Sequence, residues 1–145
     1  KILQGVLEGE YPALMDLAWA IVDVRDVATA HVEALEREGA EGRHLCGNVT
    51  LRMHELVTMI RDQFPDHAGN LPTMDLSGKF GNCIAKIAAN FQPKPVKSFL
   101  KTNLGRPIEI DNSKIKSSLA MDFIPAEETI RETVQSLIDR GLVPK

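Results

Sequence analysis

The stretch "AWAIVDVRDVATAHVEALE", residues 18–36, changes its pattern partway along. It opens with the apolar run Ala18–Val22, then presents Asp23, Arg25 and Asp26 before apolar residues return at helical spacing. The run predicts a short buried strand, and the spacing after it predicts a helix. Three charged residues at such a corner can form a helix cap, an anion site or a catalytic site.

The two acids suit the start of the helix. Asp23 fits the N-cap, where a side-chain oxygen accepts hydrogen bonds from free backbone N–H groups. Asp26, three residues on, fits the acid of a capping box. We interpret both as caps and Arg25 as a solvated charge. One face of this helix is Val24, Val27, Ala28, His31 and Leu35. That face is expected to pack in the core, with His31 as a core histidine.

Composition indicates one compact domain. The chain has 145 residues, 43% of them hydrophobic, and a formal net charge of −3, which gives no reason to expect nucleic acid. The densest basic stretch, Lys94–Lys101, is interpreted as a solvated surface. We expect no membrane partner, because no apolar run approaches the ~20 residues that span a bilayer. No segment resembles a signal peptide, and Cys46 and Cys83 lie far apart, so we expect free thiols in the cytoplasm.

Further apolar stripes complete the expected elements. A helix capped by Thr50 is stopped by Pro65. Other helices are expected over 76–91, 96–104 and 125–140, and short strands over 42–48 and 106–110. The fold class is therefore α/β and helix-rich, with about five helices and three or four short strands. Such sparse strands do not complete a sheet of their own.

The chemistry of a self-sufficient enzyme is missing from the sequence. Gly-x-x-Gly occurs only as "GAEG" and "GKFG", neither after a strand, so no dinucleotide loop is present. The only tyrosine, Tyr11, is followed four positions later by Met15 rather than by Lys. The four histidines show no metal-ligand spacing. We therefore expect no catalytic, cofactor-binding or metal-binding residue in these 145 positions.

Several motifs resemble one family, in order along the chain. "VDVRDVATAHVEALE" at 22–36 is similar to the segment after the catalytic region of extended short-chain dehydrogenase/reductases. The branch is that of dihydroflavonol reductases, cinnamoyl-CoA reductases and microbial aldehyde reductases. "GEYPALMD" precedes it, "GRHLCGN" and "HELVTMIRDQFP" follow, and "DNSKIKSSLAMDFIPAEETIRETVQSLIDRGL" closes the chain.

The resemblance implies a two-part enzyme of Rossmann type. The N-terminal part of such enzymes carries the glycine-rich NADP(H) loop and the Tyr-x-x-x-Lys pair, and the C-terminal part contributes the last sheet strands and the substrate lobe. Residues 1–145 match only the later part. They are thus expected to be a single substrate-binding C-terminal region, whose partners are a small carbonyl substrate and the Rossmann half.

The resemblance also suggests a substrate class. Relatives that act on nucleotide sugars often carry a basic residue where this chain has Trp19. An indole offers area and stacking rather than charge, which favours a small hydrophobic or aromatic aldehyde or ketone. Trp19 and Met15 are the candidate substrate-pocket residues. Packing of Trp19 in the core is the competing interpretation.

Two other functions stay open at this point. One is part of a nucleotide-sugar epimerase or dehydratase, and the other is a non-catalytic interaction module. For the isolated chain we expect no reductase activity and weak NADP(H) binding at best. A large exposed apolar surface is expected where the Rossmann half would dock, and with it self-association into homo-oligomers.

Overall fold

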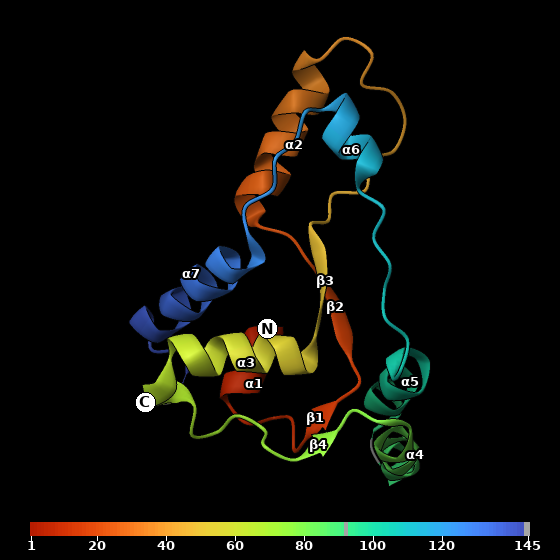
Figure 1. The fold of residues 1–145 in the computed structure, drawn as a ribbon, viewed down its shortest axis with the longest axis vertical. Coiled ribbons are helices and arrows are strands. Elements are labelled where there is room, and N and C mark those ends of the chain that lie inside the picture. Colours follow the sequence, from red (N-terminus) through yellow and green to blue (C-terminus); the bar gives the residue numbers. More distant parts are fainter. Residues whose placement is uncertain (92, 144–145) are drawn as a thin grey trace.

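The computed structural model describes residues 1–91 and 93–143 and has a helix-rich α/β fold (Figure 1). The helices of these residues are α1 (Ile2–Leu7), α2 (Val24–Glu36), α3 (Met53–Gln63), α4 (Lys79–Ala88), α5 (Lys94–Asn103), α6 (Ser113–Ser118) and α7 (Ala126–Asp139). Short 3₁₀ turns cover 65–67 and 89–91. None of the helices described is long and apolar enough to cross a bilayer.

The strands form two separate pairs. β1 (Leu14–Met15) runs parallel to β4 (Asp75–Leu76). β2 (Ala18–Ile21) runs antiparallel to β3 (Val49–Arg52), with Trp19 opposite Leu51. Each sheet has two strands, so the expectation of strands too sparse for a full sheet is confirmed for the described residues.

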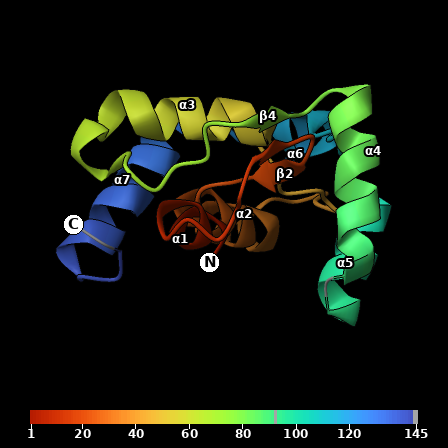
Figure 2. The ribbon, with the colours of Figure 1, turned by 90° about the horizontal axis from the view of Figure 1, so that it is seen from below.

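The main core lies where α1, α3 and α7 meet the β2–β3 pair. Its fully buried members include Val6, Leu17, Met53, Ile60, Leu104 and Val134. Ala85, Ala89 and Leu100 attach the α4–α5 arm to the same core. Seen from below, α4 and α5 stand together at one edge of the molecule, away from α7 (Figure 2). A second, smaller cluster joins α2 to α6 through Ala30, Ile115, Leu119 and Met121.

The helix-rich fold class is confirmed. The described residues contain seven α-helices, against an expected number of about five, when the short helices α1 and α6 are counted with the five longer ones. The predicted helix starting at Thr50 begins at Met53 instead, and its cap is formed when the Glu55 carboxylate accepts from the Arg52 N–H at 2.6 Å. Thr50 lies in β3. The final helix and its cap at Gly141, which has φ of +64°, are confirmed.

Both short strands predicted from sequence are absent from the described residues. Residues 42–48 form no regular element, and β3 begins only at Val49. Residues 106–110 form an irregular segment tied to β3 by a side chain, because Thr50 Oγ1 donates to the Ile108 carbonyl at 2.5 Å. Pro107 has no backbone N–H, which weakens any sheet pairing there.

The outer side of α2 differs most from expectation. His31 and Leu35 were expected in the core, yet both are exposed, Leu35 at 87%. The helix instead buries Asp26 and Ala30. The apolar spacing therefore does form one face of α2, but the part of the chain that the structure describes does not cover that face.

Candidate functional site

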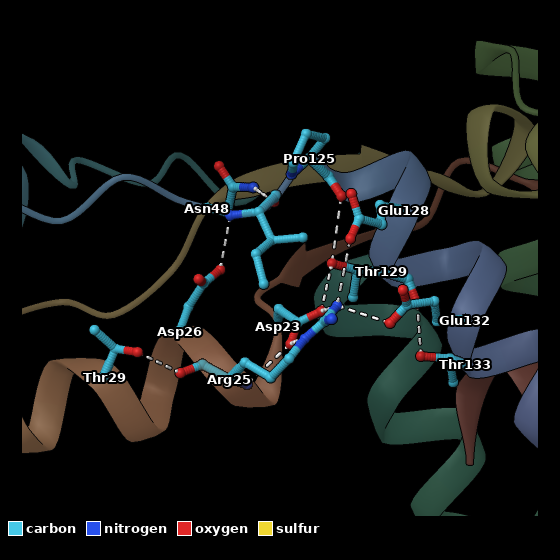
Figure 3. A network of polar contacts seen from close by, with 11 residues as sticks. Asp23, Arg25, Asp26, Thr29, Asn48, Pro125, Glu128, Thr129, Glu132 and Thr133 are labelled. Carbon is cyan, nitrogen blue, oxygen red and sulfur yellow. Dashed lines mark hydrogen bonds and ion pairs between the residues drawn. The ribbon is translucent and has the colours of Figure 1, made fainter.

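The corner between β2 and α2 is built on Asp23, as the sequence indicated (Figure 3). Asp23 is the N-cap of α2 and is only 5% exposed. Its Oδ1 accepts from the Arg25 backbone N–H at 2.8 Å and from Arg25 Nε at 2.9 Å. Its Oδ2 accepts from Arg25 Nη2 at 2.8 Å and from Thr129 Oγ1 at 3.0 Å. One buried carboxylate thus fixes the start of α2 against the first turns of α7.

Arg25 is held among acids. Besides Asp23, its Nη2 atom lies 2.8 Å from Glu132 Oε2 and 3.9 Å from Glu128 Oε1. The guanidinium beside Asp23 holds the pKa of that carboxyl well below its usual range, and the pKa of Arg25 is raised in return. The interpretation of Arg25 as a solvated charge is wrong in part, because its side chain is half exposed but forms ion pairs with Asp23 and Glu132.

Asp26 does not form the predicted capping box. Its Oδ2 accepts from the Ile124 backbone N–H at 3.1 Å, on the segment that leads into α7. Asn48 holds the same residue from the other side, since its Nδ2 donates to the Ile124 carbonyl at 2.7 Å. Burial raises the pKa of Asp26, with only partial compensation from the Ile124 N–H. Asp26 is a long-range brace rather than a local cap.

A shallow cavity of about 500 Å³ opens beside this corner. It is lined by Val22, Arg25, Thr133, Leu137 and Leu142, among others. Asp23 and Glu132 already neutralise the charge of Arg25, so this cation would attract an anion in the cavity only weakly. The corner is therefore suited to joining α2 and α7, and its arrangement does not suit anion binding. Among the residues described, no His/Cys/Asp/Glu cluster could hold a metal.

The two candidate pocket residues lie on consecutive strands of two different sheets, Met15 on β1 and Trp19 on β2. Trp19 is 9% exposed and meets Tyr11 edge to face, with ring centroids 6.3 Å apart. Met15 is half-buried, and its backbone N–H lies 3.3 Å from Met53 Sδ. Burial raises the pKa of Tyr11. The two residues belong to the same packed cluster, and their role in binding substrate stays a prediction.

Sequence reasoning missed Asp16, which links three separate segments. Its Oδ1 accepts from Arg52 Nη1 at 2.9 Å and its Oδ2 from Asn82 Nδ2 at 3.1 Å. Its backbone carbonyl accepts from the Gly105 N–H at 2.8 Å. The partners lie 36 to 89 positions away, so no local pattern could identify them. Asp16 holds the base of the α4–α5 arm to the β-strands.

Comparison with known proteins places this arrangement in context. No family model matches the chain. It is 31% identical over 135 residues to cinnamoyl-CoA reductase 1 of Arabidopsis thaliana, covering 93% of this chain and 32% of that protein. It is 30% identical over 125 residues to cinnamoyl-CoA reductase 1 of rice, covering 86% of this chain and 30% of the relative. The chain therefore spans about a third of the length of the curated relatives it matches.

A solved structure agrees with the sequence relatives. The crystal structure of Gre2 with NADPH from Candida albicans superposes with a TM-score of 0.63 at 26% identity, covering 95% of this chain and 35% of that one. The structural match and the sequence matches thus both extend over nearly the whole chain and lead to the same group of reductases. Most of the chain is therefore distantly homologous to about a third of the length of these reductases. They form the dihydroflavonol reductase and cinnamoyl-CoA reductase branch of the extended short-chain dehydrogenase/reductases.

Proposed function

We propose that this chain is the C-terminal, substrate-binding region of an NADP(H)-dependent reductase of small hydrophobic or aromatic aldehydes and ketones. In this proposal hydride transfer belongs to the longer parent protein, and the 145 residues alone are inactive. The observation that carries the proposal is the match, over nearly the whole chain, to one third of reductases whose names specify carbonyl compounds.

The unpaired segment 42–48 supports a neighbour from outside the chain. Within residues 1–91 and 93–143, the backbone groups of His44, Leu45 and Cys46 have no backbone hydrogen-bond partner. Leu45 is 55% exposed. Unpaired backbone with an exposed apolar side chain is typical of an edge that lacks its neighbouring strand. We propose that this segment pairs with the sheet of the Rossmann part.

The described residues do not fit NADP(H), so we derive no step through it. The N-terminus of α2 follows a strand, as a dinucleotide loop requires, but the Asp23 carboxylate already fills it and would repel a phosphate. In "GKFG", Gly81 faces Leu76 of β4, where an added Cβ would lie 2.3 Å from the Leu76 carbonyl oxygen. That glycine is required for packing. Cofactor binding is therefore assigned to the parent protein.

The described residues also offer no proton donor of the reductase type. A tyrosine that gives up its proton near neutral pH needs a pKa lowered by a nearby cation. The pKa of Tyr11 is shifted the other way by burial and by Glu10. We propose that the catalytic tyrosine, like the cofactor, belongs to the remaining part of the reductase.

The single tryptophan allows the substrate class to be tested on the chain itself. Trp19 emission is followed while acetophenone, which is inert without cofactor, or UDP-glucose is added. We expect a saturable change with the ketone and none with the nucleotide sugar. Met15→Ala should weaken the response at least about threefold. Met74→Ala, at a methionine that is 60% exposed, should leave it unchanged.

Absorbance at 340 nm completes the test. With NADPH and benzaldehyde, the purified chain should oxidise cofactor no faster than buffer does. NADPH oxidation by the 145 residues, or a response to UDP-glucose alone, would contradict the proposal. The second result would instead support a nucleotide-sugar epimerase or dehydratase.

A further inference from the structure

Met15, one of the two candidate pocket residues, has α4 as its neighbour. Met15 of β1 pairs with Leu76 of β4, and α4 follows directly after β4 and contacts both strands. Figure 1 shows the β1–β4 pair beside α4 and α5. Gly81 lets the helix rest on β4, because a Cβ there would lie 2.3 Å from the Leu76 carbonyl oxygen. The position of α4 therefore determines how much room there is beside Met15.

Asp16, the residue after Met15, holds α4 in this position. Its Oδ2 accepts from Asn82 Nδ2, near the start of α4, at 3.1 Å. Its backbone carbonyl accepts from the Gly105 N–H, beyond the end of α5, at 2.8 Å. One residue on the strand side thus binds both ends of the α4–α5 arm.

Arg52 fixes the direction of the Asp16 carboxylate. Arg52 Nη1 donates to Asp16 Oδ1 at 2.9 Å, so the second oxygen stays directed at Asn82. Arg52 ends β3 and lies opposite Ala18 of β2. Both strands contribute buried residues to the main core, so the carboxylate is held from a well-packed part of the molecule.

The side-chain amide of Asn82 depends on Asp16 alone. Its Oδ1 is buried and has no hydrogen-bond partner in the part of the chain that the structure describes. The bond from Nδ2 to Asp16 is therefore the only one that this amide makes there. Without Asp16 both polar ends of a buried amide lack a partner, which is costly, and water reaches them only if α4 moves outward.

We propose that Asp16 positions α4 against Met15 and thereby sets the size of the ketone that the candidate pocket accepts. The inference rests on the proposed function, because it takes Met15 and Trp19 as the pocket residues. Asp16 acts through Asn82 and is a positioning residue. With the carboxylate in place, α4 stays close to Met15 and the pocket suits a short alkyl group on the carbonyl carbon. Without it, α4 withdraws and a longer alkyl group fits.

Two ketones that differ only in the length of the alkyl group test the proposal on the chain itself. Trp19 emission is followed during titration with acetophenone and with valerophenone, and acetophenone should bind the unaltered chain more tightly. In Asp16→Ala the ratio of the two dissociation constants should shift toward valerophenone by at least about fivefold, because the added methylene groups find room. Asp16→Asn keeps one acceptor oxygen and should shift the ratio in the same direction by less.

Asn82→Leu separates positioning from a general loss of stability. Leucine has a similar shape and needs no hydrogen bond, so it stays buried when Asp16 is absent. The double variant that combines Asp16→Ala with Asn82→Leu should therefore recover the ratio of the unaltered chain. Asp23→Asn is the control, because it weakens the fold at the distant corner of α2 and should leave the ratio unchanged. Circular dichroism confirms that each variant is folded at the temperature of the titration.

The possible failures of the experiment are distinct. An unaltered chain that responds to neither ketone contradicts the proposed function and overturns this inference with it. A chain that binds both ketones, but whose ratio is unchanged in Asp16→Ala, overturns only the role of Asp16. The same holds for a shifted ratio that Asn82→Leu does not restore, since Asp16 then does not act through the buried amide.

Discussion

Asp23 and Thr129 are hydrogen-bonded across 106 positions of sequence, with Thr129 Oγ1 donating to Asp23 Oδ2 at 3.0 Å. Through this bond the N-cap of α2 also holds the first turns of α7. The same carboxylate binds Arg25, which reaches Glu132 one turn further along α7. The corner that the sequence presents as a local cap is therefore the main polar link between two helices.

Removal of the Asp23 carboxylate should destabilise the fold. Asp23→Ala loses the cap and the shorter of the two hydrogen bonds of Thr129 Oγ1, which keeps the Pro125 carbonyl at 3.4 Å, so we expect a loss of about 2 kcal/mol in the free energy of unfolding. Asp23→Asn keeps a capping oxygen and should cost about half as much. Urea unfolding measures both. The exposed Asp62→Asn serves as control, and a loss as large at position 62 would contradict this role of Asp23.

Thr129 should be coupled to Asp23 in a double-mutant cycle. Thr129→Val removes the donor while keeping the shape, at an expected cost of about 1 kcal/mol. In an Asp23→Asn background the same change should cost measurably less, because the bond is already weakened. Equal costs in the two backgrounds would show that the two residues act independently.

The two acids of the corner should respond to pH in opposite senses. The folded pKa of Asp23 is lowered, so its stabilisation is fully present above the unfolded value of about 3.9 and is lost as the pH falls from there through the lower, folded pKa. Burial raises the pKa of Asp26, so its contribution is present below about pH 3.9 and is lost as the pH rises through the folded pKa.

Two neutral variants separate these contributions. Asp23→Asn should flatten the loss of stability between pH 5 and 2. Asp26→Asn, whose side-chain oxygen can still accept from the Ile124 N–H, should be more favourable relative to the unaltered chain at pH 7 than at pH 3. Unfolding free energies measured across this range check both signs. A benefit of Asp26→Asn that is larger at pH 3 would refute the assignment.

Gly81 should be indispensable for seating α4. A Cβ there would lie 2.3 Å from the Leu76 carbonyl oxygen, so Gly81→Ala must displace α4 from β4 at a cost of about 2 kcal/mol or more. Gly78→Ala is the matched control, because a Cβ at Gly78 meets nothing within 4 Å. Hydrogen exchange of the α4 amides should rise sharply in the first variant. Equal protection in both would contradict the expected clash.

Asp16 should hold the base of the same arm. Asp16→Ala removes the acceptor of both Arg52 and Asn82, so hydrogen exchange should increase across α4 and α5 before it increases in α3. Asp16→Asn should be intermediate, since one oxygen still accepts. Uniform exchange throughout the chain would show global destabilisation rather than release of the arm.

Sequence patterns predicted elements whose stability is local. Asp23 as a cap, the stripe of α7 and the end of that helix at Gly141 are set by residues a few positions apart. The long-range partners of Asp26 and Asp16 could not be predicted, because each lies on a segment whose position only the whole fold determines.

Apolar spacing predicted a face but not what covers it. His31 and Leu35 follow the same period as the buried residues of α7, yet the described chain leaves them exposed. The apolar pattern of a helix reflects the surface on which the helix packs, and that surface need not belong to the same 145 residues. Residues 42–48 differ from a strand for the same reason, since a strand is defined by its neighbour.

Asn112 gives that segment an unexpected property. Its Nδ2 donates to two successive carbonyls, of Gly47 at 2.8 Å and Asn48 at 3.0 Å, and Lys114 Nζ donates to the Arg43 carbonyl at 3.1 Å. Side chains thereby anchor the backbone at both ends of the segment. A strand that docks along it meets a backbone that is already held in place and has only its own chain to order, which favours tight pairing of the two edges.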